Sequence, residues 1–152
     1  MDNFNQFLDK IEFINYKSDN KKVYEDLIKD SNGKDICRGL IHPGVIEELL
    51  TSEEIEGYVA KINGKYVGFV LFKHLYDTVY LSLIATRPKL GLPLGQILLT
   101  KMEEYAIARR AMDLQCDAIP EAYKFYIKMG WEVVYQNQDS KEYSMKKNIY
   151  KQ

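Results

Sequence analysis

The sequence predicts a mixed α+β fold (mixed α/β) with a mostly antiparallel, twisted central sheet of about six to seven strands and about four flanking helices. Three observations predict it. A hairpin pattern surrounds Asn63-Gly64, an amphipathic helix pattern follows a nearly continuous apolar run, and two strand patterns end the chain. The chain of 152 residues has no internal repeat or linker, so we expect one domain over residues 1–152.

The first third of the chain shows one strand pattern and two helix patterns. Ile11 to Lys17 is a short run of apolar and polar residues that fits a strand. Apolar residues recur at helical spacing from Val23 to Lys29, and Asn32-Gly33 then ends the helix. A second helix is predicted over His42 to Glu54, where Pro43 suits the first turn.

The centre of the chain predicts an antiparallel meander of three strands. Glu56 to Ile62 and Tyr66 to Leu75 flank Asn63-Gly64, and these two residues permit the positive φ angles that a type I′ turn requires. The third strand, Thr78 to Thr86, is nearly all apolar. Such a composition is typical of a central strand that is covered on both faces.

The last third predicts helices and strands in alternation. A long amphipathic helix runs from about Leu94 to Met112. The next strand, Asp113 to Ile119, is expected to be parallel to the strand before the helix, because a crossover helix separates the two. A helix from Glu121 to Met129 and two strands, Trp131 to Gln136 and Lys141 to Ile149, complete the fold.

Composition argues against several classes of function. The formal net charge is -1, so no global basic field attracts nucleic acid or acidic lipid. Cys37 and Cys116 lack the spacing of a metal site and are interpreted as free thiols in a reducing compartment. No apolar run reaches the roughly 18 residues of a membrane span, and the N-terminus lacks a signal-peptide pattern. We therefore expect a cytoplasmic protein.

The loop from Arg87 to Gly95 is a candidate anion site. It joins the apolar strand to the long helix, and the first N–H groups of a helix have no partners within the helix. They lie at the positive end of the helix dipole, and glycine lets a phosphate approach the backbone closely. An ordinary Gly/Pro turn between strand and helix fits the same spacing.

The element order and this loop resemble the GNAT N-acetyltransferase family over nearly the whole chain. In that family the loop carries Arg/Gln-x-x-Gly-x-Gly/Ala and holds the pyrophosphate of CoA. When the pattern is placed by Leu98-Leu99, Gly95 matches its second glycine. Leu90 and Pro93 replace the usual Arg/Gln and first glycine, and Pro93 has no N–H to donate. The resemblance implies a GNAT-like fold with a splayed pair of parallel strands at the cofactor site, and weaker cofactor binding than is usual in the family.

By this resemblance the co-substrate is acetyl-CoA, without a metal. The implied cofactor-binding residues are Leu83, Ile84, Ala85, Leu90, Gly91, Leu92, Leu94, Gly95 and Gln96. On the strand, pantetheine would pair with the backbone and one N–H would polarise the thioester carbonyl. Read without the family, the three strand residues are ordinary core. Gly91, Arg87 and Lys89 are candidate substitutes for the missing phosphate contacts.

The segment from Ala122 to Trp131 resembles the family's closing helix, A-x-x-x-Y-x-x-x-G-[FW]. Tyr126 lies four residues before Gly130, where the family places the tyrosine that protonates the leaving thiolate. A phenol is protonated at neutral pH and suits that role. A core aromatic residue is the alternative reading of Tyr126. Ile119 stands where the family often has asparagine, so one common CoA contact is missing.

The resemblance implies transfer of an acetyl group from acetyl-CoA to a primary amine, on a small molecule or a protein, by direct attack. The general base stays open among His74, Asp77, Glu132 and Glu142, each of which also fits a surface role. Cys116 is interpreted as a buried structural thiol. The alternative is a non-catalytic GNAT-like module that binds CoA or a protein. We expect no nucleic-acid or membrane partner, and a homodimer is a further expectation.

Overall fold

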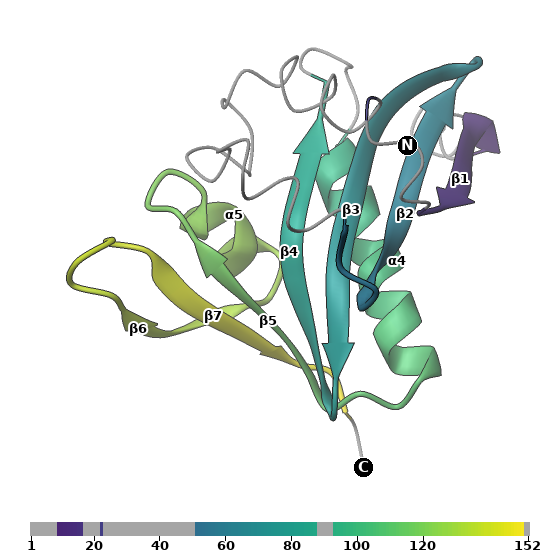
Figure 1. Ribbon diagram of the computed structural model, residues 1–152. Helices are drawn as coiled ribbons and strands as arrows, with labels where there is room; N and C mark the ends of the chain where they lie inside the picture. The colour runs from purple at the N-terminus through teal and green to yellow at the C-terminus, as the bar shows by residue number, and fades with distance from the viewer. Residues whose placement is uncertain (1–8, 17–21, 23–50, 88–92, 151–152) are drawn as a thin grey trace.

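The computed structural model describes residues 9–16, 22, 51–87 and 93–150, and the structural statements below concern these residues. They form a seven-stranded mixed sheet and two complete helices, so the predicted fold class is confirmed (Figure 1). In chain order the elements are β1 (Ile11–Asn15), β2 (Ile55–Ile62), β3 (Lys65–Leu75), β4 (Thr78–Thr86), α4 (Leu94–Ala108), β5 (Asp113–Ala118), α5 (Tyr123–Lys128), β6 (Glu132–Gln136) and β7 (Tyr143–Asn148).

The first four strands form an antiparallel arm in the order β1-β2-β3-β4. The predicted turn between β2 and β3 is confirmed, because Asn63 and Gly64 have φ angles of 52° and 81°. Both positive angles are those of a two-residue type I′ turn, whose twist matches that of the strands. The local sequence therefore sets the register of this hairpin.

The helix α4 crosses from β4 to β5 and makes these two strands parallel, as predicted. It packs on one face of β2, β3 and β4 (Figure 1). On β3, a Cβ atom at Gly68 would lie 2.9 Å from the carbonyl oxygen of Ala85 and 3.0 Å from the side chain of Leu94. Glycine at this position lets the start of α4 approach the sheet closely.

The core lies between α4 and the middle of the sheet. Phe69, Val70, Leu71 and Phe72 on β3 are 0% exposed, so both faces of this strand are covered. The prediction that β4 is covered on both faces holds for its second half only. In its first half Tyr80 is 38% exposed, because the side chain lies on the face away from α4.

One extra residue interrupts the pairing of β4 with β3. Leu83 pairs with Leu71 and Leu81 pairs with Phe72, which leaves Ser82 as a bulge. A bulge bends its strand and increases the local twist. Because β4 pairs with β5 only as far as Tyr80, the bulge lies two residues beyond the last shared rung.

The predicted end of the long helix was wrong by four residues. The helix α4 ends at Ala108 instead of Met112. Arg110 takes a positive φ of 60°, and the N–H of Met112 donates to the carbonyl of Asp77 at 2.7 Å. This contact with the β3–β4 turn draws the chain out of the helix and into β5.

Three other helix predictions also need correction or lie, wholly or in part, outside the described residues. The helix expected from Glu121 to Met129 is the six-residue α5, which begins at Tyr123 after a turn. The helix expected over His42 to Glu54 does not reach its predicted end, because Ser52 to Glu54 are not helical. Its earlier part, and the helix expected over Val23 to Lys29, lie outside the described residues. In the described part of the chain no helix has the length and apolar character to cross a bilayer.

Candidate active site

The candidate site lies where β4 and β5 diverge. These strands pair at three positions only, from Thr78 with Asp113 to Tyr80 with Gln115, whereas β5 pairs with β7 along its whole length. The sheet thereby divides into an arm of β1–β4 and an arm of β5, β7 and β6 (Figure 1). The arms meet at the N-terminal ends of β4 and β5, so the predicted splayed parallel pair is present.

The start of α4 offers backbone donors beside the end of β4. Pro93 precedes the helix, no side chain in the described part of the chain caps it, and its first turn carries no acidic residue. Leu94 is buried, whereas Gly95 is half-buried and Gln96 is exposed. The N–H groups of a first turn have no acceptor within the helix, so this end suits an anion.

Three of the predicted loop residues, Leu90, Gly91 and Leu92, lie outside the described residues, as does Lys89. Arg87 lies within them. Its Nε donates to the carbonyl of Tyr66 at 2.7 Å, and its backbone N–H donates to the carbonyl of Val67 at 2.8 Å. Arg87 therefore ties the end of β4 to β3, and its role as a phosphate contact stays a prediction.

The predicted strand residues Leu83, Ile84 and Ala85 all have buried side chains. One edge of this segment pairs with Leu71, Val70 and Phe69 of β3. Because β5 has separated from β4 below this level, the other edge faces the second arm across the divergence. Only the backbone of these residues is placed to meet a ligand there.

Tyr126 is 3% exposed, and its ring lies against those of Phe125 and Trp131, with centroids 5.3 Å away in each case. Its carbonyl accepts the N–H of Trp131 at 2.9 Å, and Gly130, with a φ of 94°, lets the chain turn between them. The closing-helix pattern thus has a packing role at each of these positions, and the acid role of Tyr126 stays a prediction.

The helices α4 and α5 lie on the same face of the sheet. The ammonium of Lys147 on β7 contacts the Glu103 carboxylate of α4 at 2.7 Å. It also donates to the carbonyl of Met129, directly after α5, at 3.0 Å. One side chain therefore links the end of α5 to α4 on the side where the two arms separate.

A cavity of about 520 Å³ opens at the divergence on the opposite face of the sheet. Tyr80 pairs with Gln115 at the last shared rung, and both residues line it. Alternation along β5 puts Asp117 on the same face as Gln115. Leu81 of β4, Cys116 of β5 and residues of β6 and β7 complete the described lining, so the cavity spans both arms.

Two aspartates differ in how they are engaged near this cavity. The Asp113 carboxylate lies 3.6 Å from the ammonium of Lys146, so the negative charge of Asp113 is partly neutralised. The exposed Asp117 accepts a hydrogen bond on Oδ1 from the hydroxyl of Ser144, at 3.1 Å. A carboxylate can accept several hydrogen bonds, so Asp117 retains capacity for an ammonium ion in the cavity.

Cys116 is a buried thiol, as predicted. Burial, and to a lesser extent the charge of Asp117, raise the pKa of the Cys116 thiol well above its usual value. A neutral thiol is a poor nucleophile, so this environment does not favour nucleophilic chemistry at Cys116. Within the described ranges, no three His, Cys, Asp or Glu side chains gather where they could hold a metal ion.

None of the four general-base candidates lines this cavity. His74 lies on the α4 face beside the ring of Tyr105, with centroids 6.1 Å apart. Asp77 and Glu132 are exposed elsewhere, and Glu142 is half-buried. Sequence reasoning missed Asp117 because its partner, Ser144, comes from the last strand. Only the register of β5 with β7 brings the two together.

The chain belongs to the GNAT acetyltransferase family. Its sequence matches the model of the Acetyltransferase (GNAT) family over residues 20–131, which is more than half of the chain. No curated protein matches the sequence.

Solved structures of N-acetyltransferases share this fold. The PaiA N-acetyltransferase from Thermoplasma acidophilum, in complex with coenzyme A, is 16% identical with a TM-score of 0.71 over 91% of this chain and 99% of that one. The ribosomal-protein-S18-alanine N-acetyltransferase from Escherichia coli is 16% identical with a TM-score of 0.73 over 93% and 96%. The aminoglycoside 6'-N-acetyltransferase from Enterococcus faecium is 15% identical with a TM-score of 0.72 over 93% and 98%. At these identities the likeness concerns the fold.

Proposed function

We propose that this chain transfers the acetyl group of acetyl-CoA to a primary amine, of a small molecule or a protein, by direct attack. The observation that carries the proposal is the divergence of β4 from β5 beside the open start of α4, in a chain of the GNAT acetyltransferase family. The coenzyme A in the similar PaiA N-acetyltransferase supports acetyl-CoA as the donor.

The residues present fit such a donor. The first N–H groups of α4, at Leu94, Gly95 and Gln96, would hold the pyrophosphate, and Gly95 adds no side chain in its way. The edge of β4 from Leu83 to Ala85 that faces away from β3 would bind pantetheine as an added strand. Pro93 has no N–H, so the start of α4 offers fewer N–H donors to the pyrophosphate than the family pattern provides.

Acetyl-CoA supplies an activated thioester. The nitrogen of the neutral amine forms a bond to the acetyl carbon, the carbon–sulfur bond breaks, and the amine proton passes to solvent. A backbone N–H of β4 would stabilise the negative charge on the acetyl oxygen. Tyr126 would give its phenol proton to the departing sulfur and regain one from solvent.

The cavity on the opposite face would hold the acceptor. It reaches the last shared rung of β4 and β5, so an amine bound there approaches the divergence from the side away from α4. Asp117 would bind the acceptor in its ammonium form before the proton is lost. Among the described lining residues Asp117 is the carboxylate, and the ammonium of Lys146 is paired with Asp113, so the lining favours a cationic acceptor.

Thermal unfolding with and without acetyl-CoA tests the donor site. Ligand at about 100 times its Kd stabilises a protein by about 2.7 kcal/mol. For a domain of this size, that corresponds to a rise in Tm of about 5–10 °C. No shift at millimolar acetyl-CoA would contradict the proposal. A shift without thiol release over a panel of primary amines would support the non-catalytic module instead.

Tyr126→Phe tests the acid role. Loss of a general acid lowers kcat by about 100-fold or more, and Phe keeps the ring packing against Trp131. Tyr123→Phe is the matched control, because Tyr123 lies on the same helix and stacks on Tyr143 at a centroid distance of 4.1 Å. Thiol release, measured for both variants alongside their Tm values, separates the two effects. An unchanged kcat in Tyr126→Phe removes Tyr126 from the mechanism.

A further inference from the structure

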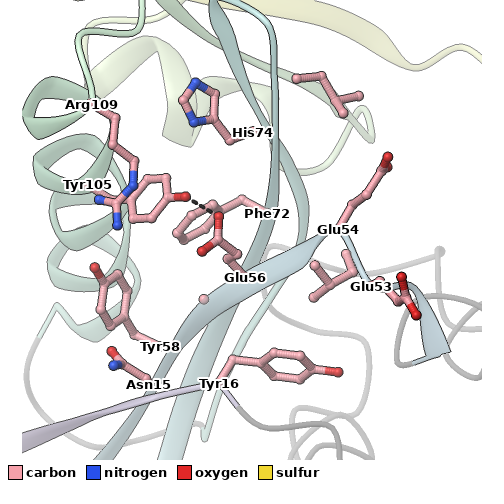
Figure 2. Close-up of a pocket in the computed structure, with 13 residues that line it drawn as sticks. Asn15, Tyr16, Glu53, Glu54, Glu56, Tyr58, Phe72, His74, Tyr105 and Arg109 are labelled. Atoms are coloured by element: carbon pink, nitrogen blue, oxygen red, sulfur yellow. Dashed lines mark hydrogen bonds between the residues drawn. The ribbon is translucent and has the colours of Figure 1, made fainter.

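A second cavity of about 520 Å³ lies on the α4 face of the sheet, away from the divergence. Its walls are the end of β1, the start of β2, the end of β3 and the C-terminal half of α4 (Figure 2). Its volume is within the range of about 300–1,000 Å³ that is typical of small-molecule sites. No residue lines both this cavity and the one at the divergence.

The charged groups around this cavity are mostly carboxylates. Glu53, Glu54 and Glu56 line it, against one guanidinium, that of Arg109. Arg109 stacks on the ring of Tyr105, 3.7 Å from the centroid, so its planar face is already used by an aromatic partner. Among the described residues, the lining therefore carries an excess of negative charge.

Glu56 is held in a fixed orientation at the centre of this lining. The hydroxyl of the buried Tyr105 donates to Oε2 of Glu56, as the dashed line in Figure 2 marks. Burial, and then the bond to Glu56, raise the pKa of Tyr105 well above its usual value, so the phenol remains a donor at neutral pH. The Tyr105 bond uses one oxygen of Glu56, and a carboxylate has a second with its own lone pairs.

Aromatic rings form the apolar part of the wall. Phe72 lies against Tyr105 and Tyr58, with centroids 4.7 Å and 6.1 Å away. The ammonium of Lys101 lies 5.2 Å from the centroid of Tyr58, which shows that this ring already attracts a cation. Carboxylates beside aromatic faces are the combination that binds organic cations.

We propose that this cavity binds a small aliphatic ammonium ion. The ammonium group bonds to the second oxygen of Glu56, and the hydrocarbon part packs against Tyr58 and Phe72. Glu53 and Glu54 add attraction at the outer wall. This ligand site is separate from the acceptor site proposed at Asp117, since the two cavities lie on opposite faces of the sheet.

Isothermal titration calorimetry with 1,4-diaminobutane tests the site, without acetyl-CoA and at constant ionic strength. We expect the diamine to bind, and 1,4-butanediol, which has the same length and no charge, not to bind. Glu56→Gln should weaken diamine binding at least about tenfold, as for loss of a hydrogen bond to a charged group. Glu132→Gln, an equal charge change at an exposed position of β6 outside this cavity, should leave it unchanged.

Two further variants locate the bound diamine. Tyr58→Leu should weaken binding by removing a ring face, and Asp117→Asn should leave the Glu56-dependent binding in place. If Glu56→Gln does not fold, Glu54→Gln at the exposed outer wall takes its place, with a smaller expected loss. Absence of binding at millimolar diamine, or binding that only Asp117→Asn removes, overturns the proposal. The latter result would place the diamine at the acceptor site, and neither result depends on turnover.

Discussion

The two arms of the sheet have the same kind of strand pairing and very different burial. Every residue of β3 from Val67 to Phe72 is buried, and α4 packs on one face of this strand. In the outer strand of the second arm, β6, no residue is buried, and Val134 is 59% exposed. The polar groups of the candidate acceptor cavity, Asp117 and Ser144, lie in this second arm. Packing free energy is thus concentrated in the first arm, whereas the candidate contacts to the acceptor lie in the second.

Phe69→Ala should produce the largest effect on stability. Phe69 is fully buried in the first arm, and removal of such a side chain costs about 3–5 kcal/mol of unfolding free energy. Denaturant titration of the variant measures it. A loss below about 1 kcal/mol, within the range of many ordinary substitutions, would show that the first arm does not carry the core.

Asp117→Asn should change acceptor binding and leave stability nearly unaltered. Loss of a charge-assisted bond raises KM for a cationic amine about tenfold or more. Because Asp117 is exposed and Asn can still accept from Ser144, the unfolding free energy should change by less than about 0.5 kcal/mol. Steady-state kinetics and denaturant titration give both values.

The matched control for that variant is Asp139→Asn, in the exposed turn between β6 and β7. It removes the same charge from the same arm, outside the cavity. Equal rises in KM for the two variants would mean that general electrostatics, and not the position of Asp117, governs acceptor binding.

Val134→Ala should produce the smallest effect. The side chain is mostly exposed on β6, so its removal should alter the unfolding free energy by less than about 0.5 kcal/mol. Measured in parallel with Phe69→Ala, the change in unfolding free energy of Val134→Ala compares the packing of the two arms. A cost above about 1 kcal/mol, outside that range, would indicate that β6 is covered in solution, and a concentration-dependent Tm would then identify self-association.

Sequence patterns predicted the parts of the fold that local chemistry determines. Asn63-Gly64 specified its turn by backbone preference alone, and the apolar run of β4 indicated a central strand before any pairing was known. The end of α4 was missed because a tertiary contact sets it, the bond from Met112 to the β3–β4 turn. The spacing of apolar residues along the helix gives no information about that contact.

The candidate site divides in the same way. Tyr126 and Gly95 were found from short patterns whose members are close in sequence. Asp117 was not, since its place in the cavity depends on pairing between β5 and β7, and on the separation of β5 from β4. No feature of the segment from Asp113 to Ala118 distinguishes Asp117 from an ordinary surface carboxylate.

Because of the bulge at Ser82, a change in the number of residues in β4 has a different effect from a change in the identity of one of them. Before the bulge Leu81 shares a face with Phe72, toward α4, and after it Ile84 shares that face with Val70. Odd-numbered residues therefore point toward α4 on one side of Ser82, and even-numbered residues on the other. A one-residue deletion here would move every later side chain of the strand to the opposite face of the sheet, although the residues themselves would not change. This strand should therefore tolerate a volume-conserving apolar substitution better than an insertion or deletion.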